Sequence, residues 1–327
     1  MIIENSKTYN LTDVENLFFR PTFCGKAAEE YGIKVLYNMP IPTKVPLFSH
    51  NNDILKGFAP GWQGGSSANF SQKEVPMKKL KAESAYSAED YFSTIYGMIA
   101  ASAEVNLGDL TGTDLEKAET ELFRRSLAES IYANTWFGDE SGQISDFSGF
   151  DGFIRRFLDL YNDHESNTSI IMYDDNTEME VKEILHKAWC NANEKLRSLA
   201  SEGNLAFFVS SDIYDAYQFY LDNIGATNAY AEATSGRLPL NYHGIPLVEI
   251  PTNGYTTYCA NSFCILTDRR NLVLALNTAD SPEKEIRMWY NPDEMENRQR
   301  VVFLAGTMLA DETLLSGSIF NSSVDFI

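Results

Sequence analysis

His186 and Cys190 are four residues apart, a spacing that suits two ligands of one metal ion. The stretch around them predicts a helix, and positions i and i+4 of a helix lie on the same face. Two ligands do not complete a site, and no second cluster of metal-binding residues is obvious in the sequence. We therefore interpret the pair as part of a packed helix face, and we expect neither a metal nor another cofactor.

Carboxylates that could act as general acid and base are plentiful, because the 327 residues include 46 Asp and Glu. Asp212 with Asp215, or Asp174 with Asp175, can be nominated as pairs, but nothing singles them out. Acidic pairs arise by chance in such a chain and usually form a solvated face. The phosphate-binding motifs GxxxxGK[ST] and GxGxxG and the nucleophile motif GxSxG are absent. We predict no catalytic residues and no enzymatic activity.

The formal net charge of −20 argues against a protein whose main role is to bind nucleic-acid phosphates. It is compatible with a surface that faces DNA without holding it tightly. The densest basic cluster is Lys78, Lys79 and Lys81, and three lysines on a strand are typical of an exposed sheet edge.

The cysteines show no CxxC spacing, which indicates free thiols made in a reducing cytoplasm rather than a disulfide scaffold. They are Cys24, Cys190, Cys259 and Cys264. The first residues lack the pattern of a secretory signal, and no apolar run approaches the roughly 20 residues of a membrane span. We therefore expect no membrane association.

One long amphipathic helix is predicted over Thr113–Phe137, about 37 Å in length. Thr113 and Glu116 form a capping box, and Gly138 is a candidate for the residue that ends the helix. Glu121 is placed to pair with the two arginines that follow it by one turn. The apolar positions of the helix recur at helical spacing: Leu115, Ala118, Leu122, Phe123, Leu127, Ile131, Tyr132 and Trp136. Polar substitution of Leu122 or Ile131 is expected to abolish folding.

The segments before this helix look extended. Residues 1–31 predict an arm with short helical pieces at Leu11–Phe18 and Phe23–Tyr31. Residues 32–81 contain short extended runs interrupted by prolines, around a glycine- and serine-rich loop tip at Pro60–Phe70. The alternatives are a disordered linker and a projecting two-stranded hairpin. We favour the hairpin, which would have to lie on another chain because an isolated hairpin is only marginally stable.

The segments after it predict a compact αβαβ unit followed by strands. A helix is expected from a capping box of Thr177 and Glu180 to about Leu199, ended by Gly203. The remaining expected elements are a strand at Leu205–Ser210, a helix at Asp212–Asn223, a surface loop at Ala226–Leu238, and strands at Ile245–Ile250, Ser262–Leu266, Asn271–Leu276, Glu285–Tyr290 and Arg300–Leu309. A strand at Glu74–Ala82 and a helix from Ser87 to about Ala103 precede the long helix.

In the order of its segments and in short local sequence patterns, essentially the whole chain resembles the major capsid proteins of tailed bacteriophages, which have the Hong Kong 97-type fold. The phrases that carry the resemblance are VPMKKLKAESAYSAEDY, FSGFDGFIRRFL, LAFFVSSDIYDAYQFYL, YHGIPLVEIP and NLVLAL.

The resemblance implies an α+β chain with an N-terminal arm, an extended hairpin loop, a long spine helix, and peripheral and axial domains. The implied division is an arm at 1–31, an extended loop at 32–73, a peripheral domain at 74–138 and 255–327 with the spine helix at 113–137, and an axial domain at 139–254. Residues 226–238 would line the centre of a capsomer.

The function implied is a structural protein that self-assembles into hexamers and pentamers of an icosahedral head around double-stranded phage DNA. The virion is the implied location, with assembly in the host cytoplasm and with portal, scaffolding and decoration proteins as partners. Two alternatives remain: an encapsulin-like nanocompartment shell, and an acidic cytoplasmic hydrolase that uses a carboxylate pair.

Two departures from the family pattern limit what the resemblance implies. No long helical segment precedes the arm, so a fused scaffolding domain is not expected, and a scaffold would be a separate protein or absent. Some family members cross-link a loop lysine to an asparagine of a neighbour. Lys44 and Lys56 lie in the loop and Asn321 lies near the end, but no residue marks a catalytic glutamate, so the cross-link is not carried over to this chain.

Overall fold

The structure is a computed structural model that describes most of the chain from residue 28 to residue 320. The described residues are 28–39, 43–50, 58, 60–61, 68–87, 114–142, 147–163, 169–173, 180–223, 240–252, 262–278 and 286–320. Several expectations fall outside them: nearly all of the arm, the helix at 87–103, the loop at 226–238, Thr113, Thr177, Asp174 with Asp175, Cys24, Cys259, Lys56 and Asn321.

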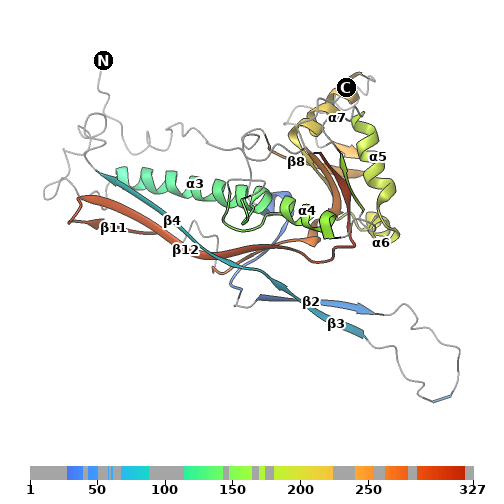
Figure 1. The fold of residues 1–327 in the computed structure, drawn as a ribbon, viewed down its shortest axis with the longest axis horizontal. Coiled ribbons are helices and arrows are strands. Elements are labelled where there is room, and N and C mark those ends of the chain that lie inside the picture. The colour runs from blue at the N-terminus through green and yellow to red at the C-terminus, as the bar shows by residue number, and fades with distance from the viewer. Residues whose placement is uncertain are drawn as a thin grey trace.

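The long helix is confirmed as α3 (Asp114–Phe137), which lies along a sheet in Figure 1. Glu121 accepts hydrogen bonds from Arg124 at 3.0 Å and Arg125 at 3.1 Å, as the spacing predicts. Gly138 follows the helix without a left-handed backbone. Its role is close approach, because a Cβ there would lie 2.1 Å from the carbonyl oxygen of Phe150.

The sheet beneath α3 has five strands and is organised around one long strand, β12 (Glu296–Leu309). Its other members are β1 (Lys34–Leu36), β10 (Leu272–Leu276), β11 (Arg287–Asn291) and β4 (Lys78–Ser87). Burial alternates along β12 from Glu296 to Ala305, with Val301, Phe303 and Ala305 buried in the cluster that includes α3. This alternation is that of a sheet with one open face.

A second sheet of six strands runs β5-β13-β9-β6-β8-β7. The strands are β5 (Ile170–Tyr173), β13 (Leu315–Phe320), β9 (Phe263–Asp268), β6 (Leu205–Ser210), β8 (Ile245–Ile250) and β7 (Asn241–Tyr242). Every residue of β6, β9 and β13 is buried, because both faces of these strands are covered. Phe208 and Ile265 belong to the cluster that contains α3, whereas Phe207 and Leu266 belong to a second cluster with the helices on the far face.

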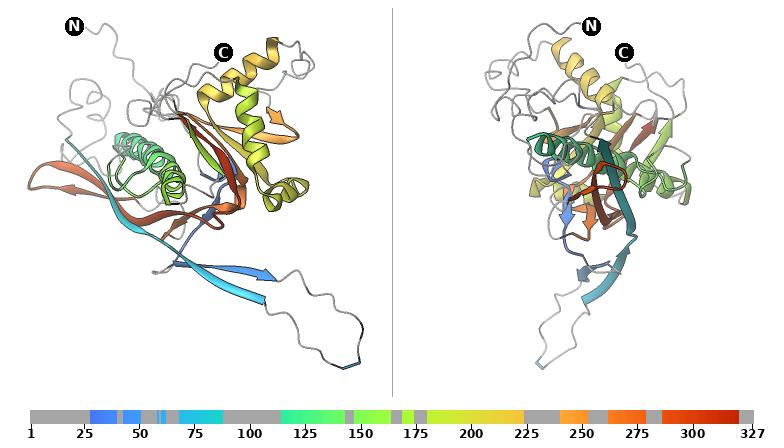
Figure 2. Two further views of the ribbon diagram at one scale, coloured as in Figure 1. Left: turned by 45° about the vertical axis from the view of Figure 1, so that its right-hand side comes forward. Right: turned by 90° about the vertical axis from the view of Figure 1, so that its left-hand side faces the viewer.

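Helices cover the two faces of the second sheet (Figure 2). The face toward α3 is met by α4 (Phe153–Asp163), and the far face by α5 (Val181–Asn191) and α7 (Ser211–Asn223). The chain therefore folds as α+β, with one hydrophobic cluster shared by both sheets and α3.

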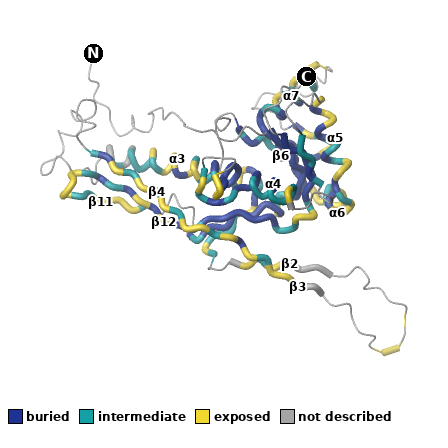
Figure 3. The backbone as a smooth tube through the Cα atoms, viewed as in Figure 1, coloured by how far each residue is buried: buried dark blue, intermediate teal, exposed yellow. Residues whose placement is uncertain are grey.

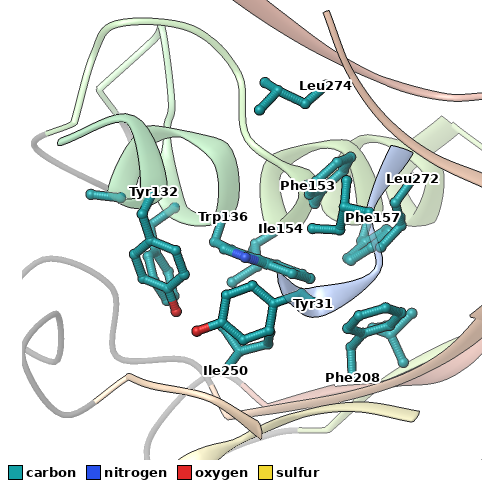
Figure 4. Close-up of a cluster of buried hydrophobic side chains, with 14 of the residues drawn as sticks. Tyr31, Tyr132, Trp136, Phe153, Ile154, Phe157, Phe208, Ile250, Leu272 and Leu274 are labelled. Carbon is teal, nitrogen blue, oxygen red and sulfur yellow. The ribbon is translucent and has the colours of Figure 1, made fainter. Parts of the chain in front are cut away.

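Trp136 lies at the centre of that shared cluster, at the end of α3 (Figure 4). Its side chain is fully buried, and its ring centroid lies 5.3 Å from that of Phe153, 5.6 Å from Phe208 and 6.3 Å from Phe263. The residue therefore joins the spine helix to α4 and to two strands of the second sheet.

The expected helix at Thr177–Leu199 is wrong as a single element. It is α5 followed by α6 (Glu194–Ser198) and a 3-10 turn at Leu199–Glu202, which ends at left-handed Gly203. Ala192 is extended at the break, and the Asn193 side chain accepts a hydrogen bond from the Leu196 amide at 2.7 Å. A side chain that caps a new helix competes with continuation of the old one.

The expected strand at Glu74–Ala82 is also divided. β3 (Ala68–Val75) ends before Pro76, and β4 begins at Lys78. Proline has no amide hydrogen to donate to a ladder, which explains an interruption at this point.

The resemblance to capsid proteins places residues 255–327 in the peripheral domain, but the strands of this range pair in two different sheets. β9 pairs with β6, and β13 pairs with β5 and β9, so both strands lie in the sheet formed by residues 139–254. β10, β11 and β12 remain in the sheet beneath α3. The segment therefore contributes to both sheets.

Leu122 is 37% exposed, so its polar substitution is no longer expected to abolish folding. Leu122 lies outside the hydrophobic cluster that α3 shares with both sheets, whereas Ile131 packs against that cluster. None of the helices that the structure describes is long and apolar enough to cross a membrane.

Candidate assembly surfaces

The predicted projecting hairpin is confirmed. β2 (Thr43–His50) pairs antiparallel with β3, from Thr43 opposite Val75 to His50 opposite Ala68. The two strands form a sheet of their own and extend away from the rest of the protein in both views (Figures 1 and 2). Where the side chains of β3 are described beyond its root, they are largely exposed, including Phe70 at 52% (Figure 3).

The root of the hairpin is fixed to the body. Val75 is buried against Val273, Ala275 and Met308 of the five-stranded sheet. Pro76 passes so close to Gly306 that a Cβ on Gly306 would lie 2.2 Å from the Pro76 carbonyl oxygen. The hairpin is thus anchored at one end and largely exposed at the side chains of β3 that are described beyond its root, an arrangement that suits contact with another chain.

The second open surface is the face of the five-stranded sheet that points away from α3, which we call the open sheet face. It carries exposed Trp289 and Val302 and a set of charged residues: Lys79, Lys81, Glu83, Arg298 and Arg300. The Arg300 guanidinium lies 5.6 Å from the Trp289 ring centroid, and Lys81 pairs with Glu83 at 2.7 Å. An exposed aromatic among cations is typical of a surface used in association.

The lysine cluster noted in the sequence lies on β4, which pairs with β12 along one side. Lys78, Lys79 and Lys81 are all exposed. Lys78 pairs with Glu140 at 2.7 Å. The three lysines lie on two faces of the strand, since successive side chains alternate, and they do not form one patch.

Of the two candidate catalytic pairs, Asp212 with Asp215 lies among the residues that the structure describes. Asp212 accepts a hydrogen bond from Ser262 near the start of α7, while Asp215 is exposed. Cys264 is fully buried, and burial raises the pKa of its thiol. Within the part of the chain that the structure describes, no group of three or more His, Cys, Asp or Glu side chains is placed to hold a metal.

A groove of about 590 Å³ lies at the hairpin root, between β3, α4 and β12. Its walls are charged, but the cations have partners: Lys73 pairs with Glu312, Arg155 with Asp159 at 3.0 Å, and Arg156 with Asp151 at 3.6 Å. The first pair ties the hairpin root to the segment after β12, and the other two hold the arginines of α4 along the wall. The groove is therefore best interpreted as a structural junction.

Tyr217 on α7 forms part of an aromatic cluster at the outer end of the second sheet. Its hydroxyl donates a hydrogen bond to the Asn241 carbonyl oxygen at 3.2 Å. Burial, followed by the nearby Tyr242 and Tyr220, raises the pKa of Tyr217 above its ordinary value.

This shift predicts a loss of stability in alkali. The folded protein keeps the phenolic proton at a pH where the unfolded chain has lost it, so the stabilisation is present below pH ~10 and is lost as pH rises through the folded-state pKa. We expect Tyr217→Phe to make the fall in unfolding free energy above pH ~10 shallower, as measured by urea unfolding across pH. At neutral pH the variant loses only its hydrogen bond, about 1 kcal/mol. Parallel pH profiles for the two proteins would contradict this assignment.

Comparisons with known proteins give matches in structure alone. No family model matches the chain, and no curated protein sequence does. A chain of the satellite phage P4 procapsid is similar, with a TM-score of 0.53, 9% identity and coverage of 90% of this chain and 96% of that one. The capsid of Ralstonia phage GP4 gives a TM-score of 0.52 at 12% identity over 98% and 93%.

A third match is an encapsulin. The SrpI encapsulin complex of Synechococcus elongatus gives a TM-score of 0.51 at 8% identity, over 98% of this chain and 99% of that chain. At such identities the likeness is one of fold. It agrees with the projecting hairpin, the spine helix on its sheet and the second sheet described above, and the chain has the Hong Kong 97-type capsid fold.

Proposed function

We propose that the protein is the major capsid protein of a tailed bacteriophage, a shell subunit that assembles with copies of itself into hexamers and pentamers of an icosahedral head. The observation that carries the proposal is the β2–β3 hairpin, which is anchored to the body at its root and projects away from it. A two-stranded hairpin is only marginally stable alone, so a neighbouring subunit is the natural partner for it. The structural likeness extends over nearly the whole length of the matched phage capsid chains, which supports the same function.

The open sheet face is the surface we propose for contact between subunits. The exposed Trp289 and Val302 supply apolar surface that a neighbouring subunit could bury, and the charged residues beside them would orient that subunit. We expect the assembled interfaces to fall in the obligate class, above about 2,000 Å².

We also propose a division into peripheral and axial domains. The five-stranded sheet with α3 would form the peripheral domain, and the six-stranded sheet with α5–α7 the axial domain. Strands β9 and β13 go to the axial domain because of their pairing.

Packaged double-stranded DNA would face the inner surface without sequence-specific contacts. The net charge of −20 supports a wall that confines DNA rather than one that binds it. Portal, scaffolding and decoration proteins are further proposed partners, the virion is the proposed location with assembly in the host cytoplasm, and the role is structural rather than enzymatic.

A nanocompartment shell is the second candidate, favoured by the likeness to an encapsulin over nearly the full length of both chains. Both candidate functions require a closed protein shell, and they differ in what the shell encloses. A nanocompartment would copurify with an enclosed enzyme, whereas a phage head protein would not.

The test is electron microscopy of the expressed full chain, alone and together with phage head-assembly proteins. We expect closed shells, and mass spectrometry of their contents separates the two candidates. Monomers and dimers under every condition would contradict both, and would leave the hydrolase alternative to be tested by activity.

A further inference from the structure

We propose that β4 pairs edge to edge with β4 of a second copy of this chain, as two antiparallel strands related by a twofold axis at Ala82. The contact is separate from the hairpin and from the open sheet face. It does not depend on the shell role, because two free subunits are enough to form it.

β4 is the outermost strand on its side of the five-stranded sheet (Figure 2). Its ten residues pair with β12 in antiparallel register, from Lys78 opposite Ala305 to Ser87 opposite Glu296. β10 and β11 take the opposite edge of β12. Among the strands that the structure describes, β12 is the one partner strand of β4. The outer edge of β4 therefore offers its backbone amide and carbonyl groups to a further strand.

The sequence of β4 does not close this edge to pairing. The strand contains no proline, and its register with β12 runs without a bulge. Prolines, bulges and charged side chains are the usual features that keep an edge strand from pairing. β4 uses charges alone, so its edge accepts a strand only where those charges are matched.

The charges of β4 are matched by β4 itself in one register. Lys81 and Glu83 lie on the open sheet face, and the Lys81 ammonium is 2.7 Å from the Glu83 carboxylate. An antiparallel pair centred on Ala82 sets Lys81 of each copy directly opposite Glu83 of the other, and opposite charges across a ladder stabilise it. The same register sets Lys79 opposite Ala85, so no two like charges face each other directly.

Neighbouring registers lose this match. An axis at Lys81 sets two lysines opposite each other, and an axis at Glu83 sets two carboxylates opposite each other, which destabilises a ladder. An axis between two residues reverses the side-chain directions of one copy, so its open face would continue the face that α3 covers in the other. The charge pattern thus selects a second copy as the occupant and fixes the register.

Disulfide cross-linking tests the register. The parent is the full chain with every cysteine except the buried Cys264 replaced by serine. Lys81→Cys and Glu83→Cys are prepared separately in this parent, mixed and oxidised. We expect a disulfide between the two variants, because they are directly opposite in the ladder. Lys81→Cys alone should not cross-link, since its copies meet diagonally at ~7–8 Å, beyond the reach of a disulfide.

The matched control mixes Lys81→Cys with Ala85→Cys, which is exposed on the same face two residues further along β4. In the proposed register these two positions are diagonal, so no disulfide is expected. Equal cross-linking in the control and test mixtures, or none in the test mixture, would overturn the proposal.

Charge exchange gives a second measurement, by sedimentation of free subunits. Lys81→Glu and Glu83→Lys each place like charges opposite each other twice in the dimer, and we expect each to weaken dimerisation by about tenfold or more. The double variant restores both pairs and should dimerise like the parent, with thermal unfolding as the check that all variants fold. A double variant as weak as the single variants would refute the register. Dimers without shells would support this contact and contradict the shell role.

Discussion

Trp136→Ala is expected to lower the unfolding free energy by about 3–5 kcal/mol, the cost of truncating a fully buried aromatic side chain. The loss is at the upper end for one residue because the indole contacts α4 and two strands of the six-stranded sheet at once. Since a domain is stable by only about 5–15 kcal/mol, this loss is a large fraction of the total stability. Urea unfolding followed by circular dichroism measures the change.

Leu122→Gln is the matched control on the same helix. Its side chain is 37% exposed and lies outside the shared cluster, so we expect a change within about 0.5 kcal/mol. Equal losses of unfolding free energy in the two variants would show that α3 stabilises the protein through helix propensity rather than through the packing of its C-terminal end.

Removal of the hairpin is expected to abolish shell formation and to leave the subunit folded. Val45 and Lys73 are direct partners across the ladder, so residues 46–72 can be replaced by Asn-Gly, which favours a two-residue turn. Val75 and its contacts remain in this variant. Electron microscopy measures assembly, and thermal unfolding measures folding.

The outcome separates two roles for the hairpin. An unfolding midpoint like that of the parent, with no shells, places its contribution in contacts between subunits. Shells of the parental diameter would show that the hairpin is dispensable. A shorter deletion of residues 51–67, joined by Asn-Gly between the partners His50 and Ala68, tests whether the strands or the tip make the contact.

The order and type of most described elements could be predicted from the sequence, because their local signals agree with the final packing. The helical period of α3 and the continuous apolar run of β10 are local properties. β13 was not predicted, since Ser316, Gly317 and Ser318 give it no apolar signal. Its place in the sheet comes from pairing with β5 and β9, which flank it from distant parts of the chain.

The assembly surfaces were predictable in part. A hairpin without a core could be inferred from the prolines and the loop tip, whereas the open sheet face could not. The side chains of Trp289 and Arg300 come together through pairing of β11 with β12, and nothing in their spacing predicts which face of the sheet α3 covers. His186 and Cys190 are both exposed on α5 rather than packed, and the contact of the Tyr242 hydroxyl with His186 is also long-range and gives no local signal.

The crossing of Pro76 over Gly306 has a mechanical consequence. Each hairpin strand has eight residues and is about 26 Å long, and the hairpin is fixed to the body near one end by a contact between two backbones. A displacement of a few tenths of an ångström at this contact therefore produces a larger displacement at the far end of the strands. The direction in which the hairpin projects is thus set inside the sheet, at a position where a single added methyl group on Gly306 would meet the Pro76 carbonyl oxygen.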